Sequence, residues 1–127
     1  MQTRDQERAR QAYNDIQEAL KTLPDKAQGK YGPLVKKLPS YILTNGLGQT
    51  LAFLLSKGKQ DPQKEHTLLY NQISRRISKD GKLIDEVMNK DSVNYRRLTA
   101  EALAYLNWLK RFAEGEPKLR ADEQAED

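Results

Sequence analysis

The chain has 127 residues, a net charge of +4 and no cysteine. This length suits one domain with one modest core, and the lack of cysteine excludes disulfide bonds and cysteine-ligated metals. The excess of positive charge indicates an anionic partner or surface.

The first predicted helix begins at Thr3 and ends before Pro24. Thr3 and Gln6 have the spacing of a capping box, and proline disfavours continuation of the helix. One face of this helix is apolar at helical spacing and consists of Ala9, Tyr13, Ile16, Ala19, Leu20 and Leu23. The outer face mixes acids and bases, which is typical of a solvated surface.

Residues 24–33 contain two prolines and two glycines, so they are predicted to form a loop. A short helix over residues 34–38 and a strongly apolar helix over residues 40–57 follow. Pro39, between them, is either a kink or the first residue of the second helix. The Asn-Gly pair at residues 45–46 lacks flanking strand alternation, so it predicts a break or bend in the apolar helix.

Asp61 is predicted to cap the next helix, with Pro62 at its first position, and that helix runs to about residue 79. Its flank carries Arg75, Lys79 and, near the border, Arg76, with a single nearby acid. An Asp-Gly turn then leads to a short helix over residues 83–89, and Asp91 or Ser92 caps the last long helix.

The segment from Tyr95 to Gly115 is a long amphipathic helix. Its apolar seam consists of Tyr95, Leu98, Ala102, Tyr105, Leu109 and Phe112. The opposite side carries Arg96, Arg97 and Arg111 without an acid among them. Because a solvated face usually mixes glutamate with lysine, these arginines indicate a surface for an anion, and plain solubility is the alternative.

No segment shows strand periodicity, so the predicted fold is an all-α, single-domain bundle of five to six helices over residues 1–114. Residues 115–127 contain five acids and two bases and are predicted to be a disordered acidic tail. The N-terminus is polar, without the pattern of a signal peptide, and the apolar stretch over residues 41–55 is too short and polar to span a bilayer. The predicted location is the cytoplasm.

The residues offer little for catalysis. The single histidine, His66, is more typical of a packed or surface residue than of a base or metal ligand. Asp85 and Glu86 are about 100° apart on a helix and do not face one substrate. We therefore predict no enzymatic activity, no cofactor and no metal. Trp108 lies at the edge of its apolar seam, where core packing or contact with a partner is favoured over stacking on a base.

Two segments together resemble a known family. Residues 30–55 read KYGPLVKKLPSYILTNGLGQTLAFLL, and residues 95–115 read YRRLTAEALAYLNWLKRFAEG. This ordered pair is similar to the small subunit of type III-B CRISPR effector complexes, the fifth Cmr protein. The resemblance implies an all-α, non-catalytic subunit that lines up in several copies along RAMP-type backbone subunits in antiviral defence. It also implies a polymerase-like large subunit as a partner, and a groove for target RNA near its duplex with the guide RNA.

A subunit that serves every guide must not read sequence, so we predict contacts to phosphates rather than to bases. The candidate residues are Lys36, Lys37, Arg75, Arg76, Lys79, Arg96, Arg97 and Arg111. Arg76 is the weakest of them, because its border position allows a buried salt bridge. The alternative is a structural module that bridges proteins through Trp108 without touching RNA. The sequence leaves open the copy number, the self-association state and which of these cations converge.

Overall fold

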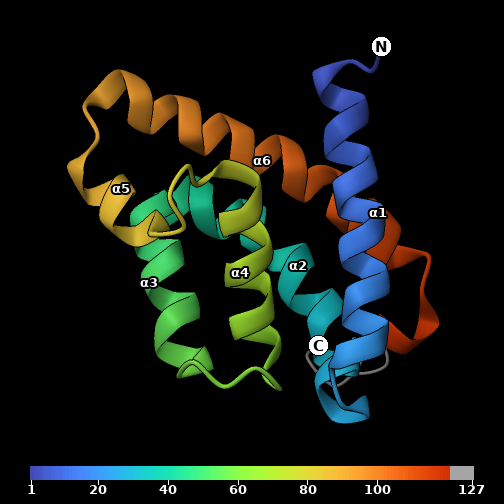
Figure 1. Cartoon of the computed structure of the whole chain (residues 1–127). Coiled ribbons are helices and arrows are strands. Elements are labelled where there is room, and N and C mark those ends of the chain that lie inside the picture. The colour runs from blue at the N-terminus through green and yellow to red at the C-terminus, as the bar shows by residue number, and fades with distance from the viewer. Residues whose placement is uncertain (121–127) are drawn as a thin grey trace.

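The computed structural model describes residues 1–120, and every regular element in that range is helical. In chain order the elements are α1 (Arg4–Thr22), α2 (Asp25–Asn45), α3 (Leu47–Gly58), α4 (Glu65–Ile77), α5 (Leu83–Asn89), α6 (Ser92–Glu114) and the 3-10 helix η1 (Pro117–Arg120). Figure 1 shows α2 in the middle of the bundle, α3 and α4 side by side, and α6 crossing behind α1. The predicted all-α class is confirmed.

Helix α1 begins as the sequence predicts. The Thr3 hydroxyl accepts a hydrogen bond from the Gln6 backbone N–H (3.1 Å), and the Gln6 side chain accepts one from the Thr3 N–H (2.8 Å). Tyr13 departs from the prediction: it is 53% exposed rather than part of the core. Its ring packs edge-on against Phe112, with 5.7 Å between the centroids.

The predicted loop over residues 24–33 is wrong, because this segment is the first half of α2. The helix continues through Pro33 and Pro39. An interior proline loses one helical hydrogen bond and costs about 3 kcal/mol. Ten residues of α2 are buried, and this burial offsets the loss, since tertiary packing supplies most of a helix's stability.

The break between α2 and α3 confirms the prediction for the Asn-Gly pair. Gly46 has φ 88°, which a residue with a side chain rarely adopts. Its N–H still donates to the carbonyl of Ile42 at 2.7 Å. The chain therefore turns at one residue, and α3 starts directly at Leu47.

Helix α4 is shorter than predicted, because it starts at Glu65 and ends at Ile77. Asp61 caps a turn instead of the helix: its carboxylate accepts a hydrogen bond from the Gln63 N–H at 3.0 Å. Helix α5 has the predicted bounds. Asp91 is the N-cap of α6, and its carboxylate accepts from the Asn94 N–H at 2.9 Å.

The predicted disordered tail is wrong for its first residues. Pro117–Arg120 form η1, which packs on α2, and Leu119 is 0% exposed. The rest of the predicted tail, residues 121–127, lies outside the described residues. A lone leucine among charged residues gave no periodic signal, so only the packed structure reveals its burial.

The apolar core contains a connected group of buried polar side chains. Tyr105 donates its hydroxyl to the Asp15 carboxylate, and Tyr31 donates to the Gln72 side-chain oxygen, both at 2.5 Å. The Gln72 amide donates to the Asp15 backbone carbonyl at 2.9 Å. This group joins α1, α2, α4 and α6 at the centre of the bundle.

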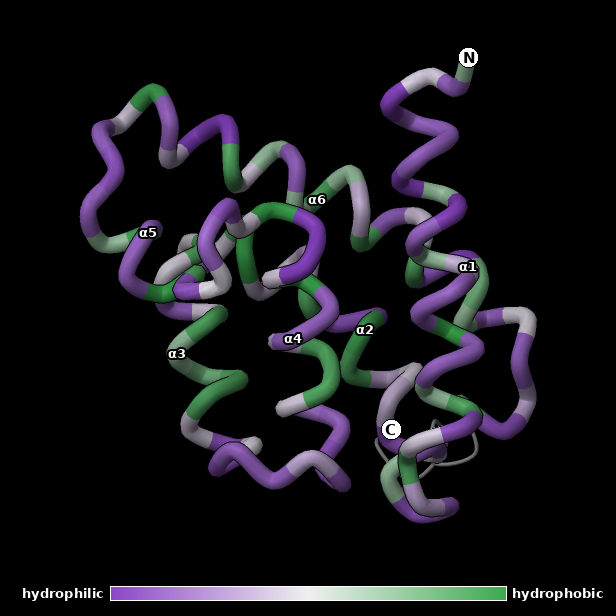
Figure 2. Tube along the Cα trace, viewed as in Figure 1, coloured by the Kyte–Doolittle hydropathy of each residue, from purple (hydrophilic) through white to green (hydrophobic). Residues whose placement is uncertain are grey.

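Hydropathy along the chain matches this arrangement. Figure 2 shows that α3 is hydrophobic over much of its length, whereas α1 and the connection between α3 and α4 are mainly hydrophilic. Within residues 1–120, no helix combines the length and the apolar character needed to cross a bilayer.

Candidate nucleic-acid interface

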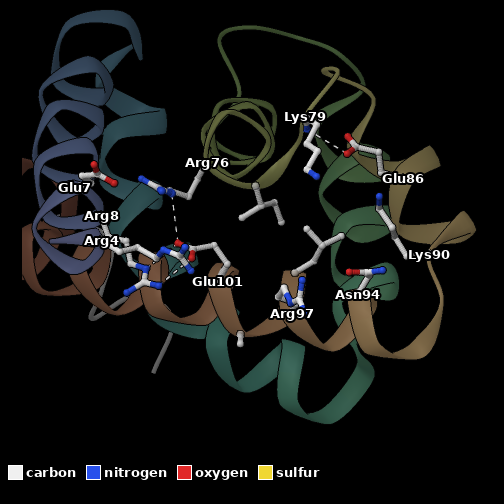
Figure 3. A pocket seen from close by; sticks show the side chains of 13 residues that line it. Arg4, Glu7, Arg8, Arg76, Lys79, Glu86, Lys90, Asn94, Arg97 and Glu101 are labelled. Carbon is white, nitrogen blue, oxygen red and sulfur yellow. Dashed lines mark hydrogen bonds and ion pairs between the residues drawn. The ribbon is translucent and has the colours of Figure 1, made fainter.

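A groove of about 530 Å³ runs between α1, α4, α5 and α6 (Figure 3). Six basic side chains line it, namely Arg4, Arg8, Arg76, Lys79, Lys90 and Arg97. Three acids, Glu7, Glu86 and Glu101, line it as well. The groove therefore has an excess of positive charge, although the cations differ in how far neighbouring acids compensate them.

Helix periodicity brings these side chains together. Asn94, Arg97 and Glu101 are three and four positions apart, so they share one face of α6. The first two turns of α1 supply Arg4 and Arg8 from the other wall. The C-terminal end of α4 and the segment that follows it supply the remaining wall.

Two of the six cations hold the helices together. Arg8 binds Glu101 with two parallel hydrogen bonds, Nε to Oε2 at 2.7 Å and Nη2 to Oε1 at 2.9 Å. Arg76 adds its Nε at 3.3 Å from Oε2 of the same carboxylate. The hydrogen bonds from Arg8 keep the pKa of Glu101 below its usual range, because they favour the ionised form. This cluster joins α1, α4 and α6.

Replacing Glu101 with glutamine should lower the free energy of unfolding at pH 7 by about 1–2 kcal/mol, because two largely covered guanidinium groups lose the carboxylate that they share, and within residues 1–120 only Arg8 keeps another ion pair, with Asp5 at 3.2 Å. Because folding lowers the pKa of Glu101, the ionised carboxylate stabilises the fold above about pH 4.3, the pKa of an unfolded glutamate. This stabilisation is lost as the pH falls through the lower, folded pKa. Urea unfolding at pH 7 and pH 3 should therefore show a difference between wild type and E101Q that shrinks in acid.

Glu7→Gln is the matched control for this experiment, because Glu7 lines the same groove but forms no ion pair within the described residues. That variant should stay within about 0.5 kcal/mol of wild type. A deficit of E101Q that is equal at both pH values would show that the carboxylate charge does not stabilise the cluster.

The other four groove cations are Arg4, Lys79, Lys90 and Arg97. Among residues 1–120, no acid lies within ion-pair distance of any of them. Glu86, which lines the same groove, accepts hydrogen bonds from the Ser78 hydroxyl and from the Lys79 backbone N–H (3.1 Å). Within residues 1–120 these four side chains are therefore not ion-paired, and of the four only Arg4 contributes to the lowered pKa of Glu101.

The predicted contact residues do not all meet on one surface. Lys79, Arg97 and the compensated Arg76 line the groove, whereas Arg96 and Arg111 are exposed on α6 outside its lining. Arg75 pairs with Asp15 at 3.0 Å and with Glu18 at 2.5 Å. Lys36 and Lys37 line two separate hollows. The salt bridge expected for Arg76 is present.

Three groove residues, Arg4, Arg8 and Lys90, were not predicted from the sequence. The mixed charges of the first helix suggested an ordinary solvated face, and nothing local to Arg4 showed that α6 lies beside it. The one available signal was the unusual density of arginines at the start of the chain.

Trp108 is half-buried rather than free on the surface. Its indole N–H donates to the Asp5 carboxylate at 3.0 Å, and its ring stacks on Phe112 with 5.9 Å between the centroids. These contacts fasten the start of α1 to α6. A role of Trp108 in binding a partner stays a prediction.

No group of three or more histidine or acidic side chains within residues 1–120 is arranged to hold a metal ion. His66 lies away from the groove, and burial lowers its pKa.

Comparison with known proteins adds independent findings. Residues 4–116 match the family model described as CRISPR-associated protein (Cas_Cmr5). The chain is 34% identical over 116 residues to a Thermus thermophilus protein named CRISPR system Cmr subunit Cmr5, covering 90% of this chain and 96% of the relative. It also resembles the crystal structure of a CRISPR-associated Cmr5 family protein from Thermus thermophilus, with a TM-score of 0.77, 34% identity, and coverage of 91% and 97% of the two chains.

Proposed function

The chain belongs to the Cmr5 family of CRISPR-associated proteins, and from this premise we propose that it is a non-catalytic subunit of a Cmr complex that holds RNA by its phosphates. The observation that carries this proposal is the groove between α1, α4, α5 and α6. Four of its cations come from separate parts of the chain and form no ion pair with an acid among residues 1–120.

Phosphate contact suits such a groove. Arginine and lysine side chains neutralise phosphates without reading bases, so the same surface can serve any guide and target. One copy neutralises few phosphates and binds RNA weakly. Several copies along one RNA raise the overall affinity, because each further contact is intramolecular.

The proposed partners are the RAMP-type backbone subunit, the polymerase-like large subunit, further copies of this chain, and the target RNA near its duplex with the guide. In this proposal the chain itself supplies no catalytic residue. Its only histidine lies outside the groove, and two of the three groove acids, Glu86 and Glu101, are engaged in structural contacts.

The double variant Lys79→Gln/Arg97→Gln should weaken RNA binding to a similar extent for every sequence. Because two phosphate contacts are lost, the slope of log K against log salt should fall by about 1.4 for single-stranded RNA. Fluorescence anisotropy with two RNAs of unrelated sequence, repeated at several salt concentrations, measures both effects. We expect the assembled complex to show the larger change in affinity.

The control is Arg96→Gln/Arg111→Gln, which removes the same charge from exposed positions of α6 outside the groove. It should change RNA binding less than the groove variant does. Equal losses from the two variants would mean that net charge acts rather than the groove. A loss restricted to one RNA sequence would contradict backbone recognition.

A second candidate function is protein bridging without RNA contact. It is favoured by large apolar side chains that are exposed at the ends of α2, α5 and α6, namely Leu43, Met88 and Val93. In that case the groove variant would bind RNA as the wild type does, and substitution of the apolar residues would release the chain from its neighbouring subunits.

A further inference from the structure

A second hollow, of about 500 Å³, lies at the opposite end of α4 from the groove. It is enclosed by one face of α2, by α3 and by the first turn of α4. This volume is in the range of sites that hold small molecules or single groups of larger ligands. The proposed phosphate groove does not involve any of its residues.

Three neighbouring rings line this hollow. Tyr41 and Phe53 are stacked, with centroids 5.0 Å apart and planes 24° apart. Phe53 also meets the edge of the His66 ring, with centroids 5.6 Å apart. All three side chains are only partly buried, although many apolar neighbours on the same helices are fully covered. An aromatic surface is therefore accessible from the hollow.

The edge of the hollow is basic. Lys30, Lys37 and Lys57 line it, and the single acid in the lining, Glu65, is 7% exposed. Burial is the main cause that lowers the pKa of His66. The Glu65 carboxylate, 3.4 Å from the His66 Nδ1 atom, raises this pKa, and the positive charges of Lys64, Lys57 and Lys30 lower it. The hollow thus combines an apolar aromatic wall with a positive potential at its opening.

We propose that this aromatic hollow binds one base of a single-stranded RNA, with the base against Phe53 and Tyr41 and the adjacent phosphates near the lysines. Every base has a flat π-face, so stacking adds affinity without selecting a sequence. A bare phosphate would not need the aromatic wall, and an uncharged ligand would not need the lysines. The proposal rests on the proposed contact of this chain with RNA and adds a second contact to it.

His66 provides the readout, because it is the only histidine in the chain and its ring gives one set of imidazole signals by NMR. The tag-free protein would be titrated with a six-nucleotide oligoadenylate, with the same oligomer lacking its bases, and with AMP. We expect the oligoadenylate to shift the His66 signals at concentrations where the abasic oligomer and AMP leave them unchanged.

Phe53→Leu keeps an apolar side chain but removes the ring, and it should weaken binding of the oligoadenylate about tenfold, since stacking contributes about 1–3 kcal/mol per base. Tyr13→Leu is the matched control, because it removes an exposed aromatic ring from α1, outside the hollow. Lys57→Gln leaves the aromatic wall in place and should also weaken binding, which keeps the test valid if F53L does not fold.

Each contrary outcome has a distinct meaning. Equal shifts with the abasic oligomer would indicate phosphate binding alone and overturn the stacking proposal. Equal shifts with AMP would assign the site to a free nucleotide instead of RNA, and a stronger response to an acidic, tyrosine-containing peptide would assign it to a protein.

If the groove variant loses RNA binding while F53L and K57Q do not, the proposed function stands and this inference fails. The reverse result would support the hollow and reject the groove.

Discussion

Replacing Asp15 with alanine is expected to lower the free energy of unfolding by about 3 kcal/mol, measured by urea unfolding at neutral pH. Asp15 is 5% exposed and accepts the Tyr105 hydroxyl at 2.5 Å and a guanidinium nitrogen of Arg75 at 3.0 Å. Alanine would leave the buried Tyr105 hydroxyl without this acceptor and would open a polar cavity between α1, α4 and α6. Both effects destabilise the fold.

Asp15→Asn separates the charge of this side chain from its shape. Burial raises the pKa of the Asp15 carboxyl, so the fold disfavours the ionised form there. Asparagine keeps an oxygen that can accept from Tyr105, and it should cost about 1 kcal/mol at pH 7. A deficit as large as that of D15A would show that the negative charge itself stabilises the core.

The pH dependence of this comparison has a definite sign. A raised folded pKa gives a contribution to stability that is fully present below the unfolded pKa and is lost as the pH rises through the folded pKa. The advantage of wild type over D15N should therefore be larger near pH 4 than at pH 7. This trend is opposite to the one expected for Glu101, whose pKa is lowered.

Gly32→Ala is expected to lower the free energy of unfolding by about 2–3 kcal/mol, although alanine is the better helix former by about 1 kcal/mol. A Cβ atom at position 32 would lie 2.1 Å from the Leu119 carbonyl oxygen and 2.9 Å from its carbonyl carbon. Backbone atoms cannot move aside as a flexible side chain can. The η1 segment must therefore shift, and Leu119 loses its burial against α2.

Two further variants test this explanation in the same unfolding assay. At Gly48 a Cβ would meet the Tyr95 hydroxyl and a Val87 methyl at 3.6 Å, an ordinary contact, so Gly48→Ala should be neutral or stabilising. Leu119→Ala should destabilise about as much as G32A, and the combination should cost less than the sum, because both changes remove one contact. Additive effects would contradict that shared origin.

Several features of this protein were determined by the sequence alone, because their causes are local. The Thr3–Gln6 capping box, the bend at Gly46 and the bounds of α5 each depend on residues within a few positions of one another. The helical spacing of apolar residues likewise predicted an all-α fold. The ordered pair of segments over residues 30–55 and 95–115 pointed to the family that the comparisons establish.

Only the tertiary structure decided the rest. Helix α2 runs through its prolines because the surrounding helices bury it, which local propensity does not register. Leu119 is buried because η1 returns to α2 at Gly32. The tertiary structure also decided which of the groove cations form ion pairs within residues 1–120. Arg8 forms an ion pair with Glu101, 93 positions away in the chain. Arg97 lies on the same face of α6 as Glu101 but forms no ion pair within residues 1–120. Ion pairing depends on distance in space, and spacing along the chain sets that distance only within one helix.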